Sequence, residues 1–293
     1  MSESLAEAPG AIDAASLKSA RRERLRLLLR SGTFIAGFII VAFWAICAIF
    51  GHHIAPQDPY ADDLLNTLDP PSADHWFGTD QLGRDVFSRV IVGAQDILTV
   101  APLATILGTI LGAALGLITG YFRGYVDDVI SRLIDAVNAL PLVIIALLAL
   151  VALGSSDATV VVVIGVIFAP IIARTVRSAV LSERELDYVA AARLRGEGPF
   201  YIMFVEILPN VLPPILVEST VRLGYAIFAV ATLSFIGFGI QPPSADWGLA
   251  IADGYSYIAG GYWWTVLFDA VAIASLVVGV NLLADGIQGA LET

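Results

Sequence analysis

The sequence predicts an all-α membrane protein with six transmembrane helices. Of its 293 residues, 57% are hydrophobic and 15% are charged, and the mean hydropathy is +0.80. A soluble domain carries about 25% charged residues, so a membrane domain accounts for this composition. A net charge of -11 argues against nucleic-acid binding by bulk electrostatics. Six apolar runs are expected to cross the ~30 Å hydrocarbon core of a bilayer: residues 33–50, 97–120, 136–153, 160–180, 211–240 and 265–283.

Residues 1–32 are expected to form a cytoplasmic tail, partly disordered, ahead of a transmembrane domain at 33–291. The tail begins with small and acidic residues, which bury too little apolar surface to fold. Residues 18–30, KSARRERLRLLLR, are basic and favour the cytoplasmic side of the first span. A surface helix on anionic lipid is the alternative. The first apolar run exceeds the core of a cleaved signal peptide, which predicts an uncleaved signal-anchor helix.

The polar loop at 51–94 is predicted to lie on the extracytoplasmic side. Its seven aspartates outnumber its only basic residues, Arg84 and Arg89, and cytoplasmic loops show the opposite bias. We expect Asp80, Arg84 and Asp85 to form a charge network that holds the loop on the membrane surface. All three histidines of the chain lie in this loop without the spacing of metal ligands, so no metal site is predicted.

Four glycines recur at every fourth position of the second span: Gly108, Gly112, Gly116 and Gly120. They form one small face of a helix, which predicts close helix packing. A sliding face in a protein that must rock is the alternative interpretation. Residues 121–135 are expected to form a cytoplasmic turn. Pro141 and Pro170 fall in the next two spans, where membrane helices tolerate kinks.

The stretch 183–210 is the longest charged interruption in the apolar second half of the chain. Its first part has the spacing of an amphipathic helix, at Leu186, Val189, Ala190, Arg193 and Leu194. Three charged side chains are expected to stay in water: Arg184, Asp187 and Arg195. Gly196, Gly198 and Pro199 then end the helix. The pattern predicts a short surface helix between two spans, and an ordinary solvated loop is the alternative.

Glu218 and Arg222 lie four residues apart within the fifth span. A charge pair inside a span is a functional hypothesis by default, although the two charges can neutralise each other. We interpret the pair as interfacial, near the cytoplasmic end of the span. A gate or a contact with a partner subunit is the alternative. No lysine or arginine follows Arg222, so the next loop is expected to be extracytoplasmic.

Three stretches resemble the permeases of ABC importers. YVAAARLRG followed by EILPN resembles the EAA loop of that family, although Ala190 stands where the family usually has Glu. HWFGTDQLGRDVFSRVIVGA and GFGIQPPSADWGLAIADG resemble the dipeptide/oligopeptide/nickel importers. The resemblance implies a MetI-like fold with a cytoplasmic coupling helix that docks on an ATPase. The coupling residues it implies are Asp187, Ala190, Ala191, Ala192, Arg193, Gly196, Leu208 and Pro209.

The resemblance further implies the second, C-type permease subunit of an ATP-driven importer that works by alternating access. Its partners would be a homologous permease, two cytoplasmic ATPase subunits and an extracytoplasmic binding protein, with both termini of this chain cytoplasmic. The chain has no GxxxxGK[ST] loop and no HExxH motif, so we expect a non-enzymatic subunit without cofactor, whose partners bind ATP and Mg. Dipeptides or oligopeptides are the expected substrates. Nickel, haem or another small solute, a stand-alone channel or secondary transporter, and an assembly subunit without a pathway are the alternatives.

Overall fold

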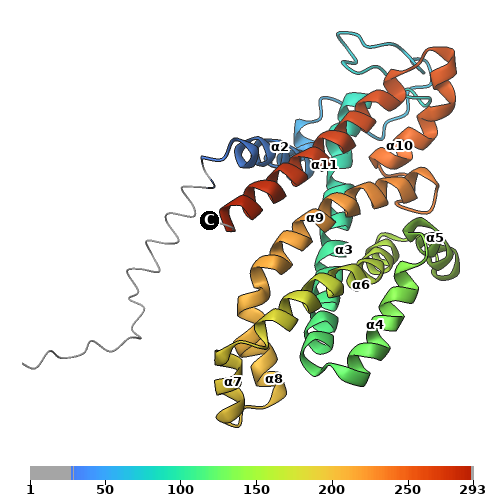
Figure 1. The fold of residues 1–293 in the computed structure, drawn as a ribbon. Helices are drawn as coiled ribbons and strands as arrows, with labels where there is room; N and C mark the ends of the chain where they lie inside the picture. Colours follow the sequence, from blue (N-terminus) through green and yellow to red (C-terminus); the bar gives the residue numbers. More distant parts are fainter. Residues whose placement is uncertain (1–27, 29, 292–293) are drawn as a thin grey trace, which may run out of the picture.

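The computed structural model describes residue 28 and residues 30–291, and it is a bundle of helices (Figure 1). The helices in chain order are α2 (Gly32–Ile54), α3 (Val86–Phe122), α4 (Gly124–Asn138), α5 (Leu142–Leu153), α6 (Asp157–Glu183), α7 (Asp187–Leu194), α8 (Pro199–Tyr201), the π-helix η1 (Ile202–Ile207), α9 (Leu208–Phe235), α10 (Trp247–Gly254), the 3-10 helix η2 (Tyr255–Gly260) and α11 (Trp264–Leu291). Residues 1–27, where most of the predicted tail falls, lie outside the described residues.

Among the described residues, five helices are long and apolar enough to cross a membrane, and a bent pair could supply a sixth span. The pair is α4 and α5, whose axes differ by 90°. With 12 residues, α5 is ~18 Å long, too short to cross alone. The expected turn at 121–135 is wrong, because Gly124–Asn138 is an amphipathic helix. The bend between the two helices ends at Pro141, which has no backbone N–H to continue a helix.

Two helix ends differ from the sequence-based boundaries because local capping decides them. The Asp85 side chain accepts a hydrogen bond from the Ser88 backbone N–H, so α3 begins at Val86 and the preceding loop shrinks to residues 55–85. At the other boundary, α9 ends at Phe235. Gly237 follows it with φ +90°, and two backbone hydrogen bonds close the last turn.

The glycine face of α3 packs directly on α6, which confirms the predicted close packing. A Cβ added at Gly112 would lie 2.7 Å from the Cβ of Ile172, and one added at Gly116 would lie 2.6 Å from the Cβ of Val176. Carbon atoms in ordinary contact are about 3.5–4.0 Å apart. The two helices therefore approach so closely that no side chain fits between them at these positions.

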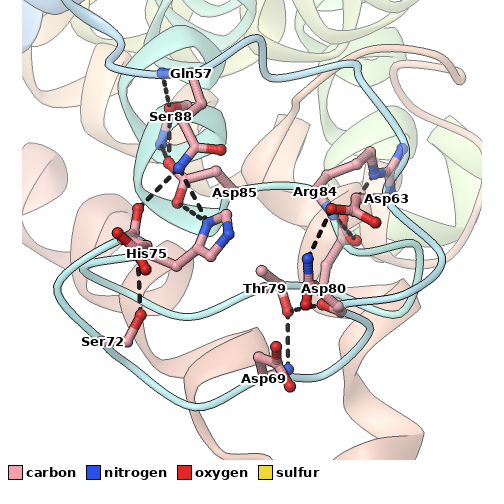
Figure 2. Close-up of polar contacts among 12 residues, drawn as sticks. Gln57, Asp63, Asp69, Ser72, His75, Thr79, Asp80, Arg84, Asp85 and Ser88 are labelled. Carbon is pink, nitrogen blue, oxygen red and sulfur yellow. Dashed lines mark hydrogen bonds and ion pairs between the residues drawn. The ribbon is translucent and has the colours of Figure 1, made fainter.

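The predicted charge network of the 55–85 loop forms in part and has two separate centres, because Asp80 pairs with Arg84 whereas Asp85 pairs with His75 (Figure 2). Asp80 lies 2.7 Å from Nε of Arg84, and its other oxygen accepts the Arg84 backbone N–H. Asp85 bonds Ser88 and lies 3.0 Å from Nδ1 of His75. From α3, the buried Arg89 donates to the carbonyl oxygens of residue 59 in the loop and of residue 244 beyond α9. These bonds join the loop to α3 and to the segment before α10.

Candidate functional site

The short surface helix predicted within residues 183–210 exists as α7, at the end of the molecule opposite the 55–85 loop (Figure 1). Its inner face contains Val189 and Ala192, both fully buried, and the helix packs on η1. Asp187 lies in the first turn and Arg193 in the last, an arrangement that complements the helix dipole. The alternative of an ordinary solvated loop is therefore wrong.

The outer face of α7 has no covering element in the described part of the chain. Leu194 is 91% exposed and Leu186 is 47% exposed, and the small side chains of Ala190 and Ala191 are exposed between them. The expected single apolar stripe is therefore wrong in detail, because Val189 turns inward while Leu186, Ala190 and Leu194 turn outward. The face they form is apolar, shallow and open.

Gly196 ends α7 through its backbone conformation. Its φ is +81°, a left-handed value that favours glycine, while an added Cβ would meet no atom within 4 Å. The N–H of Gly196 bonds the carbonyl oxygen of Arg193, and the N–H of Glu197 bonds that of Ala192. This pair of bonds defines a Schellman motif. A side chain at Gly196 would thus strain the turn without entering occupied space.

Two arginines join the α7 segment to the end of α3. Nη1 of Arg184 donates to the carbonyl oxygens of Gly120, at 3.3 Å, and Tyr121, at 2.5 Å. These carbonyls belong to the last turn of α3, which has no helical donors left to bond them. The Arg193 guanidinium lies 5.6 Å from the ring centre of Tyr121, within cation–π distance. The expectation that Arg184 stays in water is wrong, since its side chain is only 15% exposed.

A second set of contacts joins the end of the α7 segment to η1, which leads into α9, and joins α7 to the end of α6. Arg195 lies 2.6 Å from Glu206 in η1. Inside the segment, the Tyr188 hydroxyl donates to Glu183 at 2.7 Å. Burial, and then that carboxylate, raise the pKa of Tyr188 to about 12, so the phenol remains a donor at neutral pH. These contacts hold α7 against both neighbouring helices.

The structure separates the predicted coupling residues into three groups. Asp187, Ala190, Ala191 and Arg193 are exposed on α7, whereas Ala192 packs inward and Gly196 forms the turn. Leu208 and Pro209 begin α9 beyond the π-helix, with Pro209 exposed and Leu208 partly buried. Sequence reasoning missed Arg184, Tyr121 and Glu206. The one available signal was that each lies at the end of a predicted span, where helix termini need polar partners.

In the part of the chain that the structure describes, no group of His, Cys, Asp or Glu residues could hold a metal ion.

The arrangement of the helices is that of an ABC importer permease. A chain of the MetNI methionine ABC transporter, solved in inward-facing conformations, superposes with a TM-score of 0.57 and 22% sequence identity. The match covers 69% of this chain and 96% of that chain. At this identity, the likeness establishes the fold alone.

The chain belongs to the family of binding-protein-dependent transport system inner membrane components, whose model matches residues 112–293. Residues 19–71 match the N-terminal TM domain of oligopeptide transport permease C. The chain is therefore a multi-pass inner-membrane permease subunit of a binding-protein-dependent ABC importer. It is the non-catalytic, cofactor-free part of the transporter, and ATP is handled by partner subunits. These matches confirm the family, the fold and the permease role expected from the sequence.

Three curated relatives align over nearly the whole chain. The dipeptide transport system permease protein DppC of Bacillus subtilis (strain 168) is 36% identical over 267 residues, which cover 91% of this chain and 83% of that protein. The probable D,D-dipeptide transport system permease protein DdpC of Escherichia coli (strain K12) is 36% identical, with coverages of 91% and 89%. The glutathione transport system permease protein GsiD of Salmonella paratyphi A is 40% identical, with coverages of 93% and 88%.

Proposed function

We propose that this chain is one of two homologous permease subunits of an importer for dipeptides or oligopeptides. In this proposal, α7 is the coupling helix and docks in a groove of one of two cytoplasmic ATPase subunits, and an extracytoplasmic binding protein delivers the substrate. The peptide class is supported by the relatives, which are described as permeases for dipeptides, D,D-dipeptides and glutathione.

The open outer face of α7 is the observation that carries the coupling role. Leu194 is the second most exposed large apolar side chain among the described residues, at 91%, after Leu65 at 95%. An exposed leucine on a helix that is otherwise held firmly on its inner face suits a partner that covers it. The contacts of Arg184 with α3 and of Arg195 with η1, which continues into α9, supply a route for movement from α7 into two long helices.

The charge distribution supports the proposed orientation. Arginines concentrate at the α7 end of the molecule, and aspartates concentrate in the 55–85 loop, so the α7 end is assigned to the cytoplasm. An added Cβ at Gly286 in α11 would lie 2.7 Å from the Cβ of Phe34 in α2. The first described span therefore starts where the last one ends, which suits two termini on one side, here assigned to the cytoplasm.

The test replaces Leu194 by Glu in the tagged chain, expressed with its native partners. Leu194→Glu should lose co-purified ATPase subunits, because a charge would have to be buried in an apolar groove. Leu65→Glu is the matched control, since it places the same charge on an equally exposed leucine at the opposite end. Equal ATPase recovery from both variants would contradict the coupling role.

Cysteine labelling at the same two positions measures which side of the membrane each end of the molecule occupies. Cys47→Ser makes the chain cysteine-free, because it has one cysteine. In whole cells or spheroplasts, a membrane-impermeant maleimide should label Leu65→Cys and should leave Leu194→Cys unlabelled until the membrane is opened. The reverse pattern would overturn the orientation.

A further inference from the structure

The charge pair within α9 lies at the middle of that helix. Glu218 and Arg222 are 10 and 14 residues from Leu208, so the pair is ~15–21 Å from that end of α9. The hydrocarbon core of a bilayer is ~30 Å thick. The pair therefore lies near the middle of α9 and not at either end of this helix, while its interfacial position in the membrane stays a prediction.

Both oxygens of the Glu218 carboxylate have partners. One lies 2.6 Å from Nε of Arg222, and the other accepts a hydrogen bond of 3.2 Å from the Thr175 hydroxyl on α6. The carboxylate therefore holds the guanidinium by its Nε edge alone. The two side chains are 16% and 19% exposed.

The other edge of the Arg222 guanidinium is unpaired within the described residues and is not fully enclosed. Its two Nη atoms make no hydrogen bond within the described residues, and they are not among the buried polar atoms without a partner. The guanidinium lies 5.0 Å from the ring centre of Tyr225, which is 58% exposed. An arginine held by one edge, with an aromatic ring beneath it, leaves its two-pronged Nη edge free for a planar anion.

A second ion pair joins the neighbouring helices α6 and α4. Arg174 of α6 lies 2.9 Å from Asp135 of α4, and both side chains are more than 60% exposed. Arg174 is nine residues from the Glu183 end of α6, or ~14 Å along the axis. Figure 1 shows α6 running between α4 and α9. Exposed charges at this depth are costly against lipid and are found instead beside water-filled cavities.

We propose that this face of α4, α6 and α9 lines the substrate pathway, and that Arg222, at a position beside Tyr225, binds the carboxylate of the passing substrate. The inference rests on the proposed function, and it names one residue of the permease that contacts the substrate. The ligand class is a molecule with a free carboxylate, as at the C-terminus of a peptide. Because Glu218 already offsets part of the arginine's charge, the contact is weak enough to release the substrate again.

The test measures access and charge at one engineered cysteine in the assembled transporter. Tyr225→Cys is placed in the Cys47→Ser chain, and membranes opened on the α7 side are treated with an anionic or a cationic methanethiosulfonate. The anionic reagent should react about tenfold faster, because the Nη edge of Arg222 lies beside this position. Ile39→Cys is the matched control: this residue is 61% exposed on α2 and is expected to face lipid, so it should stay unlabelled by either reagent.

The role of Arg222 is isolated by neutralising the pair as a unit. The double variant Glu218→Gln/Arg222→Gln leaves no unpaired charge and should remove the preference for the anionic reagent. Glu218→Gln/Arg222→Lys should keep that preference. Millimolar alanyl-alanine should slow labelling at least threefold more than alanyl-alanine amide, which lacks the carboxylate.

Three results would overturn the inference: no labelling at position 225, a charge preference that survives the double glutamine variant, or equal protection by the dipeptide and its amide. A failure of the proposed function would be detected separately with the wild-type chain. In that case no ATPase subunit would co-purify with it, or the transporter would show no ATP-dependent uptake.

Discussion

The contact between α3 and α6 gives a prediction whose size follows from the structure. A Cβ at Gly116 would lie 2.6 Å from the Cβ of Val176 and 2.8 Å from the carbonyl oxygen of Ala173. Both neighbours, a Cβ and a backbone oxygen, are atoms that no rotamer change can move. Gly116→Ala therefore forces the helices apart, and such overpacking costs about 1–3 kcal/mol. Alanine recovers about 1 kcal/mol through its higher helix propensity.

Gly289→Ala separates these two effects. Gly289 also lies in a helix, but an added Cβ there meets no atom of the described residues within 4 Å, so this variant gains the propensity without strain against them. The melting temperatures of the two purified variants in detergent should then differ by the strain alone. At about 2–4 °C per kcal/mol, Gly116→Ala should melt about 2–12 °C below Gly289→Ala. Equal melting temperatures would refute the claim that α3 and α6 are packed too closely for a methyl group.

Two further predictions concern contacts at opposite ends of the molecule. Arg184→Gln removes charge-assisted hydrogen bonds to the last carbonyls of α3, each worth about 1.5–3 kcal/mol. In the reconstituted transporter, this variant should keep the rate of ATP hydrolysis within about twofold, while substrate uptake falls at least about tenfold. The control is Arg123→Gln, at an exposed arginine paired with Glu185 at 3.5 Å, which should keep both ATP hydrolysis and uptake. Parallel loss of hydrolysis and uptake in Arg184→Gln would argue for misfolding instead. Burial raises the pKa of Asp246 to about 6, above its ordinary value of about 4, so its contribution to stability is present below pH ~4 and is lost as the pH rises through ~6. Asp246→Asn keeps an acceptor for the Leu249 N–H and cannot ionise. The variant should therefore raise the melting temperature at pH 8 and leave it unchanged at pH 4. The same change in melting temperature at pH 4 and pH 8 would exclude a titration of this carboxyl.

Much of the fold was predictable because membrane spans and small-residue helix faces depend on residues that are close together in the sequence. The glycines at every fourth position predicted the α3–α6 contact, and the alternation of Gly, Asp and Arg predicted the network of the 55–85 loop. The helix α4 was missed because its charged residues suggested a turn, although Val126, Val129 and Leu133 lie on one exposed face. A charged helix and a charged turn differ in periodicity, not in composition.

The site was predictable in position but not in orientation. Both faces of α7 are apolar, since one packs on η1 and the other is open, and periodicity cannot tell which is which. Arg184 was expected in water because arginine usually is, yet its guanidinium bonds the end of a helix far away in the sequence. Likewise, nothing in the spacing of Glu218 and Arg222 revealed that Thr175 of α6 takes one carboxylate oxygen. Such partners depend on tertiary packing.

The length of α3 has a mechanical consequence. Its 37 residues make a rod of ~55 Å, and α6 stiffens it along the glycine face. Arg184 holds one end through the carbonyl of Tyr121, and at the other end Arg89 joins the rod to the 55–85 loop. A tilt of only ~5° about one end carries the other end of such a rod through ~5 Å. Under the proposed coupling role, a movement at α7 that tilts α3 about its Tyr121 end would therefore displace most the other end of α3, next to the 55–85 loop.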